Sequence, residues 1–226
     1  ACARVVQSNK KTRVLDFDIH PYCVWIYSQS FSGEMDLDEL KEKIATDPNL
    51  PHAYPMRQTY YREAWGLSAP YDLVEELKPG RYKVHIDTDL YDGVLRIGEA
   101  YLPGEVEEEI LINSYLCHPR GANDNLSGVV AAVEIFRMLA EMPDRHYSYR
   151  LALWPEGIGV IAYMANYPER LAKTIGGYQL GICGDGAPVS LDQTFAGDTI
   201  FDRAVKHAME FCGREVVTRK FNIYGG

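Results

Sequence analysis

The sequence predicts an α/β protein with a mixed, mostly parallel sheet and flanking helices, together with an inserted small β-rich subdomain. From residue 109 onward, buried-looking strands alternate with amphipathic helices, the order of elements that builds a parallel or mixed sheet. Before that point, residues 82–87 and 94–100 alternate apolar and polar side chains, as strands with one exposed face do. The length of 226 residues suits one large domain that carries a subdomain.

The first hundred residues combine strand-like, helical and irregular segments. Residues 23–27 are aromatic and β-branched and predict a strand. Residues 36–44 have apolar positions at helical spacing and acids in the first turn, which predicts a helix. Residues 47–79 are rich in Pro and Tyr and predict irregular structure or short helices. The Asp92-Gly93 turn signal predicts that 82–87 and 94–100 belong to one antiparallel unit.

The second half of the chain has the clearer periodicity. It predicts strands at 109–117, 149–154, 178–183 and 216–223, and helices at 126–142, 158–166 and 200–212. We assign 1–46 and 105–226 to the α/β domain and 47–104 to the inserted subdomain. The chain begins without Met and ends on a strand-like run and Gly-Gly, so we expect an internal fragment with an α/β domain incomplete at both ends.

Composition and charge exclude several classes of protein. Apolar residues make up 46% and charged residues 24%, as in ordinary globular proteins. No apolar run reaches the roughly 18 residues of a membrane helix. The net charge of −9 argues against nucleic acid as a partner. Five cysteines without a CxxC pair predict reduced thiols and a cytoplasmic location. These observations are compatible with a homo-oligomer.

Candidate chemistry follows the predicted strands of the second half. His118 and Asp124 follow strand 109–117, Glu156 follows strand 149–154, and Asp185 follows strand 178–183. Ligands of open α/β sheets bind beyond the carboxyl ends of the strands, so these side chains are expected at one edge. Imidazole and carboxylate are normal zinc ligands, and a carboxylate such as Glu156 can act as the general base toward a metal-bound water.

Each of these residues also has a plainer interpretation. His118 is compatible with an ordinary hydrogen-bonded histidine, and Asp124 with a helix N-cap, a role that Asn123 or Asn125 could also fill. Glu156 is compatible with a first-turn acid favoured by the helix dipole, and Asp185 with a turn residue between glycines.

Other chemistry is weakly supported or absent. The aromatic segment 59–66, with Tyr60 and Tyr61, could line a substrate pocket, although ordinary packing explains it equally well. Cys117 and His118 are neighbours on a strand and point to opposite faces, which argues against a nucleophile–base pair. There is no GxSxG frame and no phosphate loop of the GxxxxGKS type.

The segment Cys117–Gly128, CHPRGANDNLSG, resembles the GANDNxSG signature of the co-catalytic zinc exopeptidases, the aminopeptidase and glutamate-carboxypeptidase superfamily. It is more similar to an aminopeptidase-like branch with the pattern CHPxxANDNLSG…PETIG and an inserted β-rich domain. Further segments that look like this branch extend the resemblance over nearly the whole chain: His20-Pro21-Tyr22, Tyr27-Ser28, residues 59–66 and Tyr149-Arg150.

The resemblance implies a role for each matching position. His118 resembles a metal ligand, Asp124 the carboxylate that bridges two metals in the parent enzymes, and Glu156 their general base. The second Glu of the parents, a metal ligand, falls on Gly157, where the branch commonly has Thr. Asp185 lies a few positions late for the next ligand, and the distal His of the parents falls beyond residue 226. The resemblance therefore implies at most one zinc ion.

Three functions follow from these observations. The first is a zinc aminopeptidase that cleaves N-terminal residues from peptides, with Glu156 as general base, His118, Asp124 and Asp185 as metal ligands, and Tyr60 and Tyr61 in substrate binding. The second is an amidohydrolase acting on a small non-peptide amide such as an acylated amino sugar. The third is a degenerate, non-catalytic protein that binds peptides or sugars.

Overall fold

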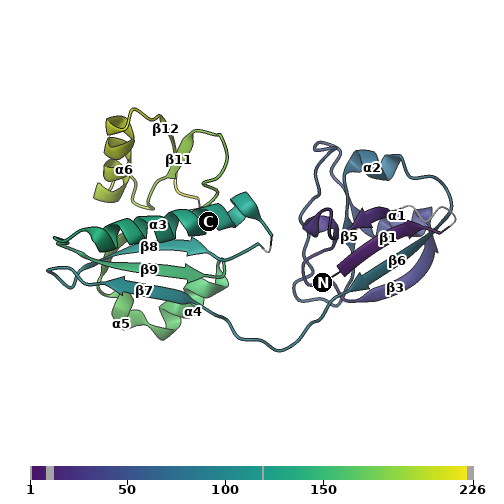
Figure 1. Cartoon of the computed structure of the whole chain (residues 1–226), viewed down its shortest axis with the longest axis horizontal. Coiled ribbons are helices and arrows are strands. Elements are labelled where there is room, and N and C mark those ends of the chain that lie inside the picture. Colours follow the sequence, from purple (N-terminus) through teal and green to yellow (C-terminus); the bar gives the residue numbers. More distant parts are fainter. Residues whose placement is uncertain (1, 9–12, 119, 223–226) are drawn as a thin grey trace. The chain divides into compact units, whose positions relative to one another are not determined.

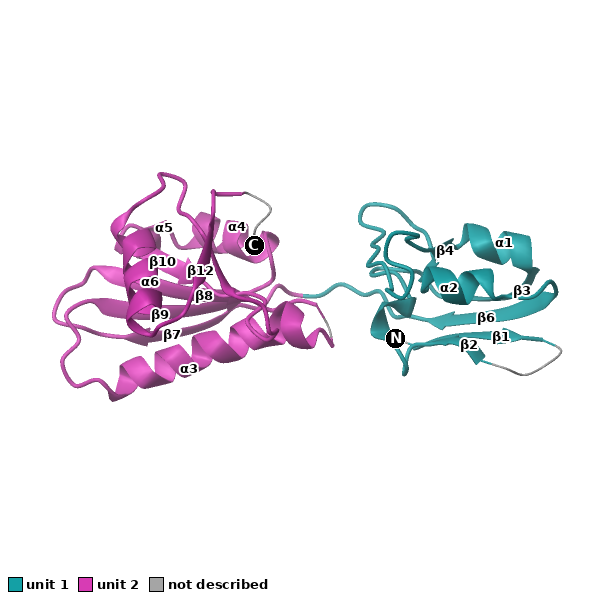
Figure 2. Ribbon diagram, turned by 90° about the horizontal axis from the view of Figure 1, so that it is seen from above, with its two compact units in different colours: residues 1–93 teal, residues 94–226 magenta. Residues whose placement is uncertain are grey.

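The computed structural model describes residues 2–8, 13–118 and 120–222. The chain forms two compact units, residues 1–93 and residues 94–226 (Figure 2). Both mix helices with small sheets (Figure 1). Among the described helices, none is long and apolar enough to cross a membrane.

Unit 1 is built on a four-stranded antiparallel sheet in the order β2-β1-β6-β3. In β6 every second side chain is buried, which directs Tyr82, Val84 and Ile86 into the core of the unit. The elements of the unit are β1 (Cys2–Gln7), β2 (Arg13–Asp16), the 3-10 helix η1 (Pro21–Cys23), β3 (Phe31–Asp36), α1 (Leu37–Glu42), β4 (Ile44–Ala45), β5 (Leu67–Ser68), α2 (Tyr71–Glu75) and β6 (Arg81–Asp87).

Helix α1 confirms the helix predicted at residues 36–44. Asp36 caps it, because its carboxylate accepts a 3.0 Å hydrogen bond from the Glu39 amide and the Glu39 carboxylate accepts one of 3.3 Å from the Asp36 amide. Leu40 is fully buried. Residues 47–79 are largely irregular and hold the short helix α2, as predicted.

One strand prediction and one pairing prediction are wrong, whereas β6 confirms the strand predicted at 82–87. Residues 23–27 form only isolated bridges, Val24 with Leu67 and Ile26 with Gln58, and the left-handed backbone of Tyr27 (φ 63°) prevents a continuous ladder. The predicted pairing of 82–87 with 94–100 does not occur, because β1 and β3 occupy both edges of β6. The later segment instead forms β7 (Gly98–Leu102), which pairs with β9 in unit 2.

The division of the chain differs from the predicted one. Residues 1–46 supply three strands to the sheet that also contains β6, so they fold with most of the segment assigned to the inserted subdomain. The observed division falls between Gly93 and Val94 instead of at residues 46 and 104.

Unit 2 contains a mixed sheet in the order β10-β8-β9-β7, in which β10, β8 and β9 are parallel and β7 is antiparallel to β9. Its remaining strands, β11 and β12, pair in parallel. The elements are β7, β8 (Glu109–Tyr115), η2 (Ala122–Ser127), α3 (Gly128–Glu141), β9 (Ser148–Trp154), α4 (Ile158–Asn166), α5 (Pro168–Leu171), β10 (Thr174–Gln179), β11 (Val189–Asp192), α6 (Ile200–Phe211) and β12 (Val216–Arg219).

Helices cover both faces of this sheet (Figure 1). On β9, Leu151 packs in a cluster with Ala132 of α3, whereas its neighbour Ala152 packs in a cluster with Tyr163 of α4. Successive strand residues point to opposite faces, so α3 and α4 lie on opposite sides of the sheet. The mixed, mostly parallel sheet with flanking helices is thus confirmed for this unit.

The strand predicted at 178–183 is displaced. Strand β10 covers Thr174–Gln179, where its ladder with β8 ends, and Ile182 beyond it has a left-handed φ of 51°. Strand β12 ends at Arg219, and residue 223 of the predicted strand 216–223 lies outside the described residues.

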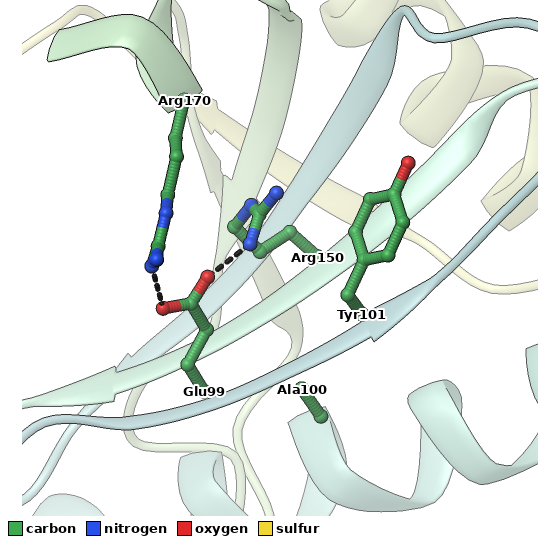
Figure 3. A pocket seen from close by; sticks show the side chains of 5 residues that line it. All are labelled: Glu99, Ala100, Tyr101, Arg150 and Arg170. Carbon is green, nitrogen blue, oxygen red and sulfur yellow. Dashed lines mark hydrogen bonds and ion pairs between the residues drawn. The ribbon is translucent and has the colours of Figure 1, made fainter. Parts of the chain in front are cut away.

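Ion pairs join the amino-terminal halves of β8 and β9 to β7. Arg150 donates two 2.8 Å hydrogen bonds to the carboxylate of Glu109, which is 1% exposed. Arg150 and Arg170 both donate to Glu99 beside a cavity of about 440 Å³ (Figure 3). Hydrogen bonding to Glu109 is the main cause of a raised pKa at Arg150. The guanidinium groups are therefore engaged with acids of the protein itself.

Asp202 anchors the start of α6 and is 1% exposed. Its carboxylate accepts hydrogen bonds from the amides of Thr194 (2.8 Å) and Thr199 (2.7 Å) and from both of their hydroxyl groups (2.7 Å each). Burial alone would raise the pKa of Asp202, but these hydrogen bonds outweigh it and lower the pKa.

We predict that Arg150→Met destabilises unit 2 by about 3–5 kcal/mol, because it leaves the buried carboxylate of Glu109 without its charged partner and with only the Thr174 hydroxyl as a donor. Urea unfolding measures the change. Arg137→Met is the matched control, since Arg137 pairs with Glu134 and Glu141 on the exposed side of α3 and should cost less than about 1 kcal/mol. Equal losses in the two variants would contradict the structural role of Arg150.

We predict that Asp202→Asn lowers stability most above about pH 4. The folded-state pKa of Asp202 lies below its unfolded value near 3.9, so its stabilisation is present above that value and is lost as the pH falls through the folded-state pKa. The stability of Asp202→Asn and wild type should therefore converge in acid. Urea unfolding from pH 7 to pH 3 tests this, with the exposed Asp144→Asn as control; a difference that does not change with pH would refute it.

Candidate functional site

Three side chains that follow strand ends in unit 2 converge at the carboxyl edge of the sheet. His118 Nε2 lies 3.7 Å from Asp124 Oδ2 and 3.9 Å from Glu156 Oε2. The His118 side chain is 14% exposed, and each carboxylate-bearing side chain is 43% exposed. A mostly buried imidazole thus faces two acids that solvent can reach. The cavity beside Arg150 is a separate feature toward the amino-terminal halves of the strands.

Tyr115, the last residue of β8, fixes the orientation of Asp124. Its hydroxyl group donates a 2.8 Å hydrogen bond to Asp124 Oδ1, and Tyr115 is 6% exposed. Burial, followed by the hydrogen bond to Asp124 and its charge, raises the pKa of Tyr115. The phenol therefore stays protonated as a donor, and Oδ2 is the oxygen of Asp124 that lies near His118.

Glu156 is joined to the end of β8 through its backbone. The Glu156 amide donates a 3.1 Å hydrogen bond to Cys117 Sγ, and the Leu116 amide donates one of 2.8 Å to Trp154 O. Burial is the main reason that the pKa of the Cys117 thiol is raised, so this thiol is a structural acceptor and no activated nucleophile. The following residue, Gly157, has a φ of 64°, a conformation that glycine adopts without strain.

Asn125 has a larger role than the helix cap considered for it. It is fully buried, and its side-chain amide donates to Ser114 Oγ (2.9 Å) and Tyr115 O (3.1 Å) while its oxygen accepts from the Ile182 amide (2.9 Å). These bonds join the loop after β8 to the segment after β10. Helix α3 has Ser127 at its N-cap and no side-chain capping bond.

Asn123 and Ser127 add to the same connection. Asn123 Oδ1 accepts a 2.7 Å hydrogen bond from the Gly184 amide, and Ser127 Oγ accepts one of 2.8 Å from the Cys183 amide. Our interpretation of the sequence missed this role of Asn123, Asn125 and Ser127. The sequence pattern that could have indicated this role is an amide or hydroxyl side chain at every second residue from 123 to 127.

Asp185 lies beside this loop and makes no direct contact with His118, Asp124 or Glu156. Asn123 Nδ2 donates a 3.3 Å hydrogen bond to Asp185 Oδ2, and the Ala187 amide donates one of 3.0 Å to Oδ1. Within residues 2–8, 13–118 and 120–222, no three His, Cys, Asp or Glu side chains form a ready set of metal ligands.

Tyr60 and Tyr61 lie in unit 1, whereas the other predicted site residues lie in unit 2. Tyr61 is fully exposed with a φ of 64°, and Tyr60 makes an edge contact with Tyr27 at 5.2 Å between ring centres. Both rings are accessible to a ligand of unit 1.

The fold of this chain resembles that of a solved structure. This structure is a crystal structure from Clostridium acetobutylicum that is provisionally described as a peptidase. It superposes on this chain with a TM-score of 0.92 at 36% identity, and the match covers 100% of this chain and 53% of the other chain. A family model described as a domain of unknown function, DUF4910, matches residues 4–226, and the chain belongs to that family.

A protein of Clostridium acetobutylicum, provisionally named a polysaccharide biosynthesis protein with an aminopeptidase-like domain, is similar to this chain. The two are 36% identical over 220 residues, which are 97% of this chain and 50% of the relative. The chain thus spans about half the length of the relatives that it matches.

We predict that Asn125→Ala destabilises unit 2 by about 2–4 kcal/mol, because it leaves several buried polar groups without partners. The amides of Ile182 and Cys183 should also lose protection in hydrogen–deuterium exchange. Asn166→Ala, which removes one exposed bond to Ala162 O, is the control and should cost less than about 1 kcal/mol. Unchanged exchange at Ile182 would contradict the role of Asn125.

Proposed function

We propose that this chain supplies part of the active site of a metal-dependent hydrolase, a zinc aminopeptidase that removes N-terminal residues from peptides. The observation that carries the proposal is that His118 Nε2 lies within 4 Å of a carboxylate oxygen of both Asp124 and Glu156. These three residues follow the ends of two parallel strands. The peptidase-like relatives support the reaction class.

The residues present fit a zinc ion in part. Two ligands with bonds of about 2.0–2.2 Å in a tetrahedral site lie roughly 3.3–3.6 Å apart, close to the 3.7 Å between His118 Nε2 and Asp124 Oδ2. Tyr115 resembles the outer partner that orients a ligating carboxylate. His118 and Asp124 would therefore hold the ion, and Asp185 could join them after a shift of its loop. When bound, zinc lowers the pKa of a coordinated water toward about 7 and polarises the scissile carbonyl.

Glu156 is the general base in this proposal. Its carboxylate is 43% exposed and lies beside His118, so it can accept a proton from the attacking water at Oε2 and pass that proton to the leaving amine. Its fixed backbone, held by Cys117 Sγ, keeps the carboxylate at the sheet edge. Acidic side chains near the metal are proposed to bind the α-amino group of the substrate.

A second candidate function is an amidohydrolase acting on an acylated amino sugar. The relative provisionally named for polysaccharide biosynthesis favours this alternative. Hydrolysis of aminoacyl anilides by the full-length protein, with N-acetyl sugars left intact, would support the aminopeptidase; the opposite preference would support the amidohydrolase. A full-length protein that binds no metal would favour the non-catalytic alternative.

We predict that Glu156→Gln in the full-length protein lowers kcat at least about 10²-fold, the range of a positioned general base, and leaves bound zinc unchanged. His118→Ala should remove both zinc and hydrolysis. Anilide hydrolysis and metal analysis measure the two effects, with Glu169→Gln of α5 as the control of equal charge. Normal turnover by Glu156→Gln would exclude Glu156 as the base.

A further inference from the structure

Unit 1 contains a cavity of about 440 Å³ that is open to solvent and is lined entirely by residues of this unit, of which Glu42, Arg57, Gln58 and Arg62 are exposed. This volume lies within the range of small-molecule sites, roughly 300–1,000 Å³. The lining consists of Trp25, Glu42, Ile44, Ala45, Arg57, Gln58 and Arg62. The cavity thus combines an aromatic and aliphatic wall with charged groups of both signs.

The charged groups of this cavity are not engaged with the protein itself. Among the described residues, the side chains of Glu42, Arg57 and Arg62 have no hydrogen-bond or ion-pair partner, whereas Arg150 and Arg170 of unit 2 are paired with acids. Two guanidinium groups and one carboxylate around a single cavity form a local excess of positive charge in a chain of net charge −9. This arrangement leaves two kinds of ionic group available to a ligand.

Trp25 forms part of the wall of the cavity, and its position is fixed by contacts with Gly66. Its amide donates a 3.1 Å hydrogen bond to Gly66 O, and a Cβ at position 66 would lie 2.4 Å from the indole ring, so only glycine allows this packing. The indole Nε1 is buried and has no partner within the described part of the chain.

The loop that carries both arginines is fixed to the segment that carries Trp25. Thr59 is 2% exposed, its amide donates to Ile26 O (3.0 Å), and its hydroxyl group donates to Tyr27 O (2.8 Å). The Ile26 amide donates to Arg57 O (2.9 Å). These bonds hold the backbone around Arg57 and Arg62 in place before a ligand arrives, which reduces the entropic cost of binding.

We propose that this cavity binds a free α-amino acid with an apolar side chain. Arg57 and Arg62 bind its carboxylate, because guanidinium groups match carboxylate oxygens in charge and geometry. Glu42 binds its ammonium group, and the side chain packs against Ile44, which is 9% exposed. The proposal depends on unit 1 alone and not on the hydrolase function of unit 2.

The test follows the indole N–H signals of the chain by two-dimensional ¹H–¹⁵N NMR during titration with L-leucine. The chain has three tryptophans, and Trp25→Phe assigns the signal of Trp25. We expect a saturable movement of the Trp25 signal and none of the signal of Trp154 in unit 2. Arg57→Gln and Arg62→Gln should each weaken leucine binding at least about tenfold, as expected for loss of a charge-assisted hydrogen bond. Lys83→Gln, which removes a positive charge on β6, should bind as wild type does.

Two analogues separate the ionic contacts. N-acetyl-L-leucine keeps the carboxylate and should bind more weakly than leucine, and Glu42→Gln should weaken leucine but not N-acetyl-L-leucine. L-leucinamide lacks the carboxylate and should not move the Trp25 signal saturably. No saturable movement up to the solubility of leucine, equal binding of leucinamide, or unchanged affinity in Arg57→Gln and Arg62→Gln would overturn the proposal. An otherwise unchanged spectrum, including the Trp65 signal, shows that each variant is folded.

Discussion

The parallel pairing of β8 with β9 is the constraint on which the candidate site depends. The two strands are in register from Glu109 opposite Ser148 to Tyr115 opposite Trp154, so both end at the same edge. A slip of one residue would move one end by about 3.3 Å and turn every side chain to the other face. The Arg150–Glu109 pair near one end of the strands and the bond from the Glu156 amide to Cys117 Sγ at the other oppose such a slip.

The carboxyl edge separates groups that support the site from groups that can react. Asn125 and Tyr115 are buried and hold the loop after β8, whereas the side chains of Asp124 and Glu156 are 43% exposed. A buried amide or phenol that is fully hydrogen-bonded costs little, but a buried unpaired carboxylate costs several kcal/mol. Placing neutral groups inside and carboxylates at the rim lets the acids stay charged while their positions remain fixed.

Much of unit 2 could be predicted from the sequence, because its central strands β8 and β9 are largely buried and its helices have a regular apolar period. The same reasoning failed at residues 23–27, since propensity reports a preference and cannot detect the left-handed turn at Tyr27. It also mispaired 82–87, because alternation shows which face is buried and carries no information about which strand lies alongside. In the structure β1 and β3 occupy both edges of β6.

The residues of the candidate site could be proposed from the sequence, whereas the hydrogen bonds that hold its loops in place could not. The rule that ligands bind beyond strand ends places His118 and Glu156 at one edge from sequence alone. The bonds of Asn125 to Ile182 and to Ser114 join segments far apart in the chain, and no local pattern reports them. The cavity beside Trp25 likewise depends on Gly66, a contact that only the folded chain defines.

The backbone at Gly157 bears on how many metal ions the site can hold. The resemblance to the co-catalytic zinc exopeptidases puts the second Glu of the parent enzymes, a metal ligand, at this position. Here φ is 64° and ψ is −70°, a backbone conformation that a residue with a Cβ rarely adopts. Glycine therefore suits the chain path after Glu156, and it removes the carboxylate that a second ion would need. Within the proposed function, a glycine at this position agrees with one ion held by His118 and Asp124 and with Glu156 as the base.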